Sequence, residues 1–211
     1  MSRPRLLDLF CGAGGAAMGA HRAGFDVVGV DNVDQPHYPF PMVRADALEA
    51  LTAFGTLFDA VWASPPCKAH TKTGWAYHFG YHANHTDLLT PTRALLEQTQ
   101  RPWVIENVPG APMRVDMVLC GSQFGLGVRR HRWFEFSEPP FQLMAPCVHD
   151  SHVVTPLGNP NKARGSRREW AEAMEIDWTA TARELSQAVP PAYGEYVGRL
   201  LLAQVHASTH G

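Results

Sequence analysis

The chain has 211 residues, of which 45% are hydrophobic and 18% are charged, and its formal net charge is −2. These values are typical of a globular protein with one core, and they exclude a disordered chain. No apolar run approaches the roughly 18 residues that a membrane-spanning helix needs. Because the four cysteines are widely spaced and no signal peptide is evident, we expect a protein of the cytoplasm.

Strands and helices alternate along the first part of the chain, as apolar runs, glycine turns and helical repeats indicate. The predicted strands are residues 5–10, 27–31, 42–44, 60–63, 103–106, 117–120 and 132–136. The predicted helices are residues 16–23, a short helix that ends at Phe54, residues 88–98, residues 166–174 and a last helix from Pro190. This alternation predicts an α/β fold with a doubly wound, mostly parallel sheet.

Two stretches of the chain have no regular pattern. Residues 68–86 are rich in His, Gly and aromatic residues and predict a long loop, which inside a compact domain is usually functional. Residues 137–166 are rich in Pro, His and Asn. We therefore expect a core over residues 1–136, a small irregular region over 137–180, and a C-terminal helical segment over 181–211 that returns to the core.

A glycine turn, Cys11-Gly12-Ala13-Gly14-Gly15, joins the first predicted strand to the first predicted helix. Glycines at such a turn let backbone amides approach a ligand closely. The turn lacks the spacing of a dinucleotide fingerprint and fits a nucleoside without a pyrophosphate better. Asp31 and Asp46 end the next two strand segments, where acids can bind ribose hydroxyls and an adenine amine. We expect an adenosine-type cofactor; a plain tight turn with two surface acids is the alternative.

Ser64-Pro65-Pro66-Cys67 follows the predicted inner strand 60–63. The two prolines restrict the backbone and place a thiol beyond the carboxyl end of that strand, where α/β proteins bind ligands. Cys67 is therefore a candidate nucleophile. The Ser-Pro-Pro run also resembles the motif of amino-methyltransferases, which act on N4 or N6 and have an aromatic residue in place of the thiol.

Four motifs occur in order: Asp-Leu-Phe-Cys-Gly-Ala-Gly-Gly at 8–15, Pro-Pro-Cys at 65–67, Glu-Asn-Val at 106–108 and Arg-His-Arg at 130–132. In this order they resemble the DNA (cytosine-5) methyltransferase family, over residues 5–136 and again faintly over 187–202. The resemblance implies the Rossmann-like fold of S-adenosylmethionine-dependent methyltransferases. It also implies methyl transfer from S-adenosylmethionine to C5 of a cytosine flipped out of double-stranded DNA, with S-adenosylhomocysteine as the second product.

The resemblance assigns roles to the motif residues. Cys67 would add to C6 of the cytosine, which turns C5 into a nucleophile, and Glu106 would contact N3 and the N4 amine. Arg132 would bind the O2 edge, with Arg130 in support. The cofactor contacts that it implies are Phe10, Cys11, Gly12, Ala13, Gly14, Asp31, Asn32, Asp46, Ala47, Pro66 and Leu88. The residues expected to bind nucleic acid are Lys68, Lys72, Trp75 and Tyr77 in the long loop, and Arg164 and Arg167 in a basic cluster.

The chain departs from the family pattern at three positions and in size. Val128 stands where a glutamine is usual, His70 where an aromatic residue is usual, and Gln187-Ala188-Val189 where Gly-Asn-Ser is usual. Only residues 137–180 are available for target recognition, which is a much reduced region. We expect a short recognition sequence, or a partner subunit that supplies recognition. So compact an enzyme would suit a phage or a bacterial restriction-modification system.

Three other functions stay open on the sequence. The first is the same chemistry on RNA, because tRNA cytosine-5 enzymes share the Pro-Cys and Glu-Asn-Val motifs. The second is amino-methyltransferase activity, and the third is a nucleic-acid-binding module without catalysis that has kept the fold. No metal is expected, because residues such as Cys147, His149 and His152 lack the paired C-x-x-C spacing of zinc sites.

Overall fold

The computed structural model describes residues 2–66, 87–142, 144–149, 153–157, 164–178 and 181–208. Cys67 and the loop predicted over residues 68–86 lie outside these ranges. Among the described helices, none is both long and apolar enough to cross a membrane.

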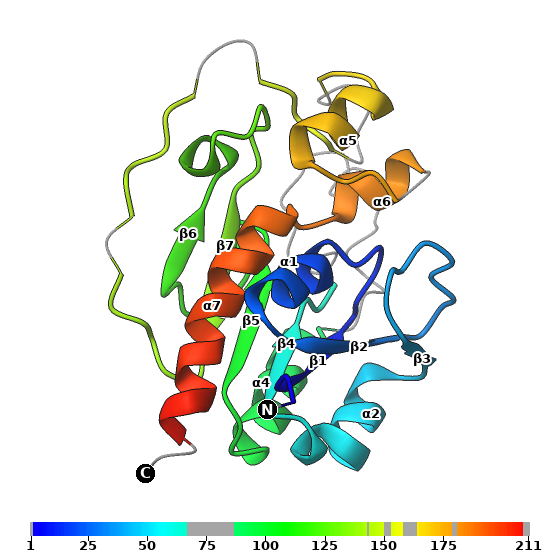
Figure 1. Ribbon diagram of the computed structural model, residues 1–211, viewed down its shortest axis with the longest axis vertical. Helices are drawn as coiled ribbons and strands as arrows, with labels where there is room; N and C mark the ends of the chain where they lie inside the picture. The colour runs from blue at the N-terminus through cyan, green and yellow to red at the C-terminus, as the bar shows by residue number, and fades with distance from the viewer. Residues whose placement is uncertain are drawn as a thin grey trace.

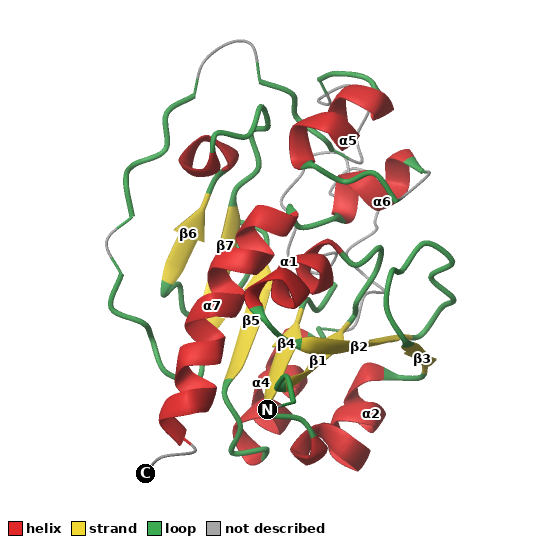
Figure 2. Cartoon of the chain, viewed as in Figure 1, coloured by secondary structure: helices red, strands yellow, loops and turns green. Residues whose placement is uncertain are grey.

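The described strands form one seven-stranded sheet in the order β3-β2-β1-β4-β5-β7-β6 (Figure 2). The parallel strands are β1 (Arg5–Leu9), β2 (Asp26–Asp31), β3 (Met42–Arg44), β4 (Ala60–Ala63) and β5 (Trp103–Asn107). The antiparallel strands are β6 (Met117–Leu119) and β7 (Arg132–Phe136). Because β2 and β4 lie on opposite sides of β1, the sheet is doubly wound, and the predicted fold class is confirmed.

Helices cover both faces of this sheet. On one face α1 (Gly15–Ala23) and α7 (Pro191–Ser208) pack side by side, and on the other lie α2 (Ala47–Phe54) and α4 (Leu89–Gln98) (Figure 1). The other helices are η1 (Gly55–Leu57), η4 (Gly121–Phe124), α5 (Arg167–Met174) and α6 (Ala182–Gln187). The predicted helices are confirmed, with ends shifted by a residue at most, whereas α6 is a helix that the sequence did not predict.

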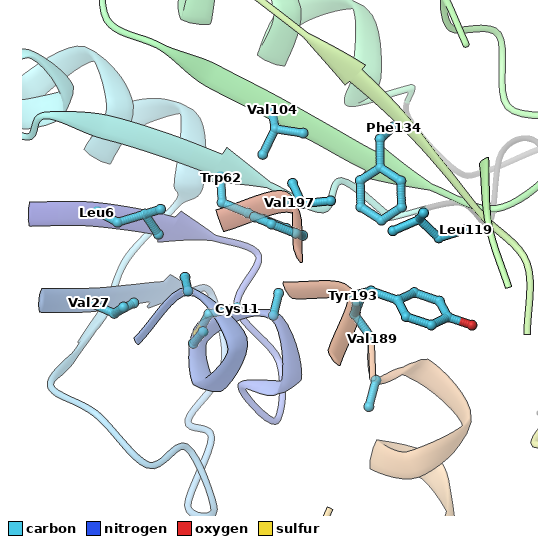
Figure 3. Close-up of a cluster of buried hydrophobic side chains, with 14 of the residues drawn as sticks. Leu6, Cys11, Val27, Trp62, Val104, Leu119, Phe134, Val189, Tyr193 and Val197 are labelled. Atoms are coloured by element: carbon cyan, nitrogen blue, oxygen red, sulfur yellow. The ribbon is translucent and has the colours of Figure 1, made fainter. Parts of the chain in front are cut away.

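The central strands are buried on both faces, as β1 illustrates. Leu6 belongs to the cluster beneath α1 and α7, together with Val27, Trp62 and Val104 from the neighbouring strands (Figure 3). Leu7, the next residue, belongs to the cluster on the opposite face. Alternate residues of a strand point to opposite faces, so a strand covered by helices on both sides reads as one continuous apolar run.

The contact between α1 and α7 depends on glycines. A methyl group on Gly19 would lie 2.3 Å from the backbone nitrogen of Glu195 and 2.3 Å from the carbonyl oxygen of Pro191. A methyl group on Gly194 would lie 2.6 Å from the carbonyl oxygen of Ala16. Because these are backbone atoms, no side-chain rotation can relieve the overlap, and the two helices would have to move apart.

Replacing Gly19 by alanine is therefore expected to lower the free energy of unfolding by roughly 1–3 kcal/mol, the usual cost of overpacking a core. Urea unfolding of the wild type and the variant measures this difference. Gly127→Ala is the matched control, because among the described residues a methyl group there would meet only the Cβ of Ala173, at 3.8 Å. Equal losses in the two variants would contradict the importance of the close contact between α1 and α7.

Candidate active site

The candidate site lies at the edge of the sheet where the parallel strands end. β1, β4 and β5 are parallel neighbours, so their carboxyl ends lie side by side. The chain order reverses between β1 and β4, and α/β proteins bind ligands outside such a point. The glycine turn follows β1, Ser64 follows β4, and Glu106 lies near the end of β5. The tertiary structure thus brings the glycine turn, the start of the Ser-Pro-Pro-Cys motif and the Glu-Asn-Val motif to the same edge of the sheet.

The glycine turn has an unusual backbone and an open outer side. Phe10 has a φ of 58°, a left-handed conformation that is uncommon outside glycine, and Gly12 and Gly14 have φ values of 50° and 81°. A methyl group built on Gly12 would meet no described atom within 4 Å. The turn therefore leaves room for a ligand to approach its backbone, as an adenosine-type cofactor would require.

Asp31, at the end of β2, is held against this turn. Its Oδ2 accepts a hydrogen bond from the backbone nitrogen of Gly12 at 3.1 Å, and its Oδ1 accepts from that of Val33 at 3.2 Å. The carboxylate is thereby positioned beside the turn, where an acid at the end of a second strand can bind ribose hydroxyls. The structure thus places Asp31 against the glycine turn, and its contact with a ribose stays a prediction.

Asp46 has a structural role that the predicted adenine contact did not include. It is the N-cap of α2, and its Oδ1 accepts hydrogen bonds from the backbone nitrogens of Leu48 at 2.8 Å and Glu49 at 3.1 Å. Such a cap satisfies backbone donors that have no partner within the helix. Its contact with a cofactor stays a prediction.

Glu106 and Arg132 form a buried ion pair across two neighbouring strands. Glu106 lies on β5, and Arg132 begins β7, which pairs with β5 in the antiparallel sense. The Nε of Arg132 lies 2.7 Å from Oε1 of Glu106, and the two side chains are only 10% and 8% exposed. The Nη1 of Arg132 also donates to the carbonyl oxygen of His131 at 2.9 Å. A carboxyl group and a guanidinium held together in this way can offer an acceptor and several donors to one planar ligand.

Asn107 connects this ion pair to the segment that leads to Cys67. Its Nδ2 donates to the carbonyl oxygen of Pro65 at 3.0 Å, and its Oδ1 accepts from the backbone nitrogen of Val108 at 2.8 Å. The backbone nitrogen of Ser64 donates to the carbonyl oxygen of Leu9 at 3.1 Å, which continues the pairing of β4 with β1. The chain is therefore anchored up to Pro65, two residues before the predicted nucleophile.

Arg130 connects β7 to segments that are distant in the sequence. Its guanidinium donates to the carbonyl oxygens of Pro156 at 3.0 Å and Ser186 at 2.9 Å. Its own carbonyl oxygen accepts from the hydroxyl of Tyr193, on α7, at 2.6 Å. The side chain is 4% exposed. The bonds in the structure make Arg130 a positioning residue for the strand that begins with Arg132.

Asp8 opens the first sequence motif, but the sequence interpretation gave it no role of its own. It lies on β1 with an exposed fraction of 1%, and its Oδ2 accepts a hydrogen bond from the hydroxyl of Tyr38 at 3.1 Å. Burial raises the pKa of this carboxyl from 3.8 to about 7; the Tyr38 bond lowers it, and the charges of Asp31 and Glu106 raise it. An acid inside an otherwise apolar strand was the signal that could have identified it.

Cys11, in the glycine turn, is buried and unsuited to be a nucleophile. Burial, followed by the charges of Asp8 and Asp31, raises the pKa of its thiol far above the usual range. A thiol must ionise to attack a ring carbon or to bind a metal. Cys11 is therefore not an alternative to Cys67 as the nucleophile.

The other predicted residues are spread around the fold. Ala47 begins α2, Leu88 is the residue before α4, and Asn32 is exposed after β2. Arg164 and Arg167 are exposed beside the start of α5. The predicted site residues outside the described ranges are Cys67, Lys68, Lys72, Trp75 and Tyr77. The nucleophile and the closing loop therefore stay predictions.

No model of a known protein family and no curated protein matches the chain. Its mixed seven-stranded sheet with helices on both faces is an α/β fold that it shares with solved structures described as methyltransferases.

A structure described as a DNA modification methyltransferase encoded within an E. coli prophage covers 96% of this chain and 99% of its own, with a TM-score of 0.60 and 16% identity. The triple mutant E260A/E261A/K263A of Spodoptera frugiperda DNMT2 covers 94% and 99%, with a TM-score of 0.66 and 12% identity. The methyltransferase EhMeth of Entamoeba histolytica covers 96% and 99%, with a TM-score of 0.63 and 11% identity. At these identities the likeness establishes the fold.

Proposed function

We propose that the chain transfers the methyl group of S-adenosylmethionine to C5 of a cytosine in double-stranded DNA. The observation that carries this proposal is the buried Glu106–Arg132 pair near the carboxyl ends of the sheet strands, where the glycine turn also lies. The fold shared with a prophage DNA modification methyltransferase and with DNMT2 supports the class of enzyme. The order of the four sequence motifs supports the C5 chemistry.

The residues around the glycine turn fit S-adenosylmethionine. The open side of Gly12 gives access to the backbone, and Asp31 is fixed beside it with two carboxylate oxygens that can also accept from ribose hydroxyls. When bound, the cofactor supplies an electrophilic methyl group on a sulfonium. Phe10, in its strained conformation, and Gly14 set the course of the turn on either side of this position.

The Glu106–Arg132 pair fits the edge of a cytosine that carries O2, N3 and the N4 amine. Arg132 can donate to O2, and Glu106 can accept from the amine and, when protonated, donate to N3. Protonation or hydrogen bonding at N3 makes C6 accept a nucleophile. A base paired in a duplex cannot present this edge to a buried site, so the cytosine must be flipped out, which costs roughly a few kcal/mol.

Cys67 is the nucleophile in this proposal. Its thiolate adds to C6, and the electron pair displaced from the C5–C6 double bond gives C5 the nucleophilic character to take the methyl group. A base then removes the proton from C5, the double bond forms again, and the bond between C6 and sulfur breaks. Asn107 would keep the segment before Cys67 in register with Glu106 through its bond to Pro65.

Trapping on DNA that contains 5-fluorocytosine tests the proposal. Fluorine replaces the hydrogen that a base must remove from C5, so the bond between C6 and sulfur cannot break and the adduct persists. With S-adenosylmethionine present, we expect a covalent protein–DNA complex that survives denaturing electrophoresis. Cys67→Ala should abolish it. The surface variant Glu172→Gln, whose parent residue forms an exposed ion pair with Arg168 on α5, should retain it.

The substrate in the same assay separates the alternatives. A complex with 5-fluorocytidine RNA and none with DNA would move the activity to RNA. Methyl transfer without any trapped complex, undiminished in Cys67→Ala, would instead indicate an amino-methyltransferase. A folded chain that binds DNA and transfers no methyl group to either nucleic acid would be a binding module.

A further inference from the structure

Two cysteines and two histidines from three separate segments meet at one place outside the candidate active site. Cys120 precedes η4, His131 precedes β7, and Cys147 and His149 lie on the extended segment that follows β7. One ligand atom from each side chain lies within 4.8 Å of all the others. We propose that these four residues form a structural zinc site.

The distances within the cluster approach those of a zinc centre. The Sγ of Cys120 lies 3.3 Å from Nε2 of His149, and Nε2 of His131 lies 3.5 Å from the Sγ of Cys147. In a tetrahedral site with Zn–S bonds of about 2.3 Å and Zn–N bonds of about 2.0–2.1 Å, ligand atoms lie roughly 3.3–3.8 Å apart. No two of the four atoms, which lie within 4.8 Å of one another, therefore need to approach by more than about 1.5 Å. Two of the side chains that would move, Cys147 and His149, are exposed.

Two side chains of η4 hold the backbone around the exposed ligands in place. The Nε2 of Gln123, on η4, donates to the carbonyl oxygen of Ala145 at 2.7 Å. The Oγ of Ser122 accepts from the backbone nitrogen of Val148 at 3.1 Å. These bonds attach the chain to η4 on both sides of Cys147. The extended segment that runs past β6 in Figure 1 is thus tied down at the point where its two ligands lie.

The donor set and the local charge favour zinc over other divalent ions. Two thiolates and two imidazoles in a compact four-ligand set are typical of structural zinc, whereas Mg²⁺ and Ca²⁺ prefer oxygen ligands. Arg129, Arg130 and Arg132 lie within two residues of His131, so an added cation there needs compensation. Two thiolates neutralise the charge of Zn²⁺. Four protein ligands close the coordination sphere, so the metal would have a structural role.

The position of the cluster gives the metal a definite task. His131 lies between Arg130 and Arg132, the residue paired with Glu106. A zinc ion bound there would tie the start of β7 to η4 and to the short segment available for target recognition. Small, irregular regions that cannot build a core of their own are commonly stabilised by a metal. The expectation that no metal is bound rested on spacing along the sequence, whereas this proposal rests on four side chains that the fold brings together.

Zinc analysis of the tag-free chain, expressed with added zinc and purified without chelators, tests the proposal. We expect about one zinc per chain in the wild type, as a closed four-ligand site requires. Cys147→Ser and His149→Ala should each lower the affinity by more than the roughly 100-fold that loss of an outer-shell partner can cost. His206→Ala, an exposed histidine on α7, is the matched control and should keep the metal.

Two further measurements distinguish zinc at this cluster from zinc bound elsewhere and from a disulfide. Cobalt in place of zinc should give the strong visible absorption of a tetrahedral site and a sulfur-to-cobalt charge-transfer band, both lost in Cys147→Ser. Chelation should lower the melting temperature of the wild type by roughly 5 °C or more and leave that of a variant with both substitutions unchanged. If zinc remained bound in this double variant, its site would lie elsewhere in the chain and the proposal would be wrong. A metal-free Cys120–Cys147 disulfide in anaerobically purified protein would also overturn the proposal.

Discussion

Glu106→Gln is expected to slow methyl transfer by roughly 100- to 10,000-fold, the range that general acid catalysis contributes. Glutamine keeps the size of the side chain and an oxygen that can accept from Nε of Arg132, which lies 2.7 Å from the carboxylate. It can also hydrogen-bond to the cytosine. It cannot deliver a proton to N3, so the ring would resist attack by the thiolate. Single-turnover transfer with saturating cofactor measures the chemical step itself.

The stability of the same variants separates chemistry from folding. Glutamine keeps an acceptor for Arg132 but loses the negative charge, so Glu106→Gln should lower the melting temperature less than Glu106→Ala does. Glu106→Ala leaves a buried guanidinium without its carboxylate, and such losses cost about 3–5 kcal/mol. A Glu106→Gln variant that kept more than about a tenth of the wild-type rate would reduce the ion pair to a structural role.

Glu135 offers a matched control for Glu106. It lies on β7 with an exposed fraction of 2%, and its two carboxylate oxygens accept from Nε and Nη2 of Arg93 at 2.8 and 2.7 Å. It is therefore an equally buried acid in a comparable ion pair, at a place that no motif connects with the cytosine. Glu135→Gln should lower stability and leave the rate of methyl transfer per folded molecule close to that of the wild type.

The second large effect concerns pH and Asp8. The folded chain holds the Asp8 proton up to about pH 7, whereas the unfolded chain loses it near the ordinary pKa of 3.8. Between these values the folded state binds more protons, so this group makes the protein less stable as the pH rises. The loss amounts to something on the order of 4 kcal/mol across that interval. Asp8→Asn removes the ionisation. Between pH 4 and pH 8 its free energy of unfolding should therefore rise by that amount relative to the wild type.

Denaturant unfolding of the two proteins at several pH values measures this gain as a difference, in which the other titrating groups cancel. Tyr38→Phe provides the companion test. The Tyr38 hydroxyl donates to Asp8 at 3.1 Å and lowers its pKa. Without that bond, the fall in stability should extend to higher pH. Parallel pH profiles for the wild type and Asp8→Asn would show that the carboxyl is not held protonated.

The first half of the fold was predictable from the sequence because its signals are local. Leu6 and Leu7 belong to a short apolar run that ends in a glycine turn, and the length and flanks of such a run are local signals that predict a buried strand. The same holds for the helix that Gly24 ends and for the strand before Ser64. Strand, turn and helix in repeated order then imply a parallel sheet, because parallel strands need a crossover.

The sequence indicated which residues belong to the candidate site, but it did not indicate how they contact one another. Local patterns indicate that Asp31, Glu106 and Arg132 lie at or near strand ends, and hence near an edge of a sheet. The contact between Arg132 and Glu106 depends on long-range packing, because it requires β7 to lie antiparallel to β5. Long-range packing also encloses Asp8 with Tyr38, which comes from a loop of no regular pattern.

The cysteine and histidine cluster shows the same division most clearly. Cys120 and Cys147 are separated by 26 intervening residues, and no spacing rule along the chain connects them. The sheet places the start of β7 beside η4, and two hydrogen bonds bring the following segment back to the same point. Sequence patterns report contacts between near neighbours, whereas a site assembled from distant segments exists only once long-range packing has closed the loops between them.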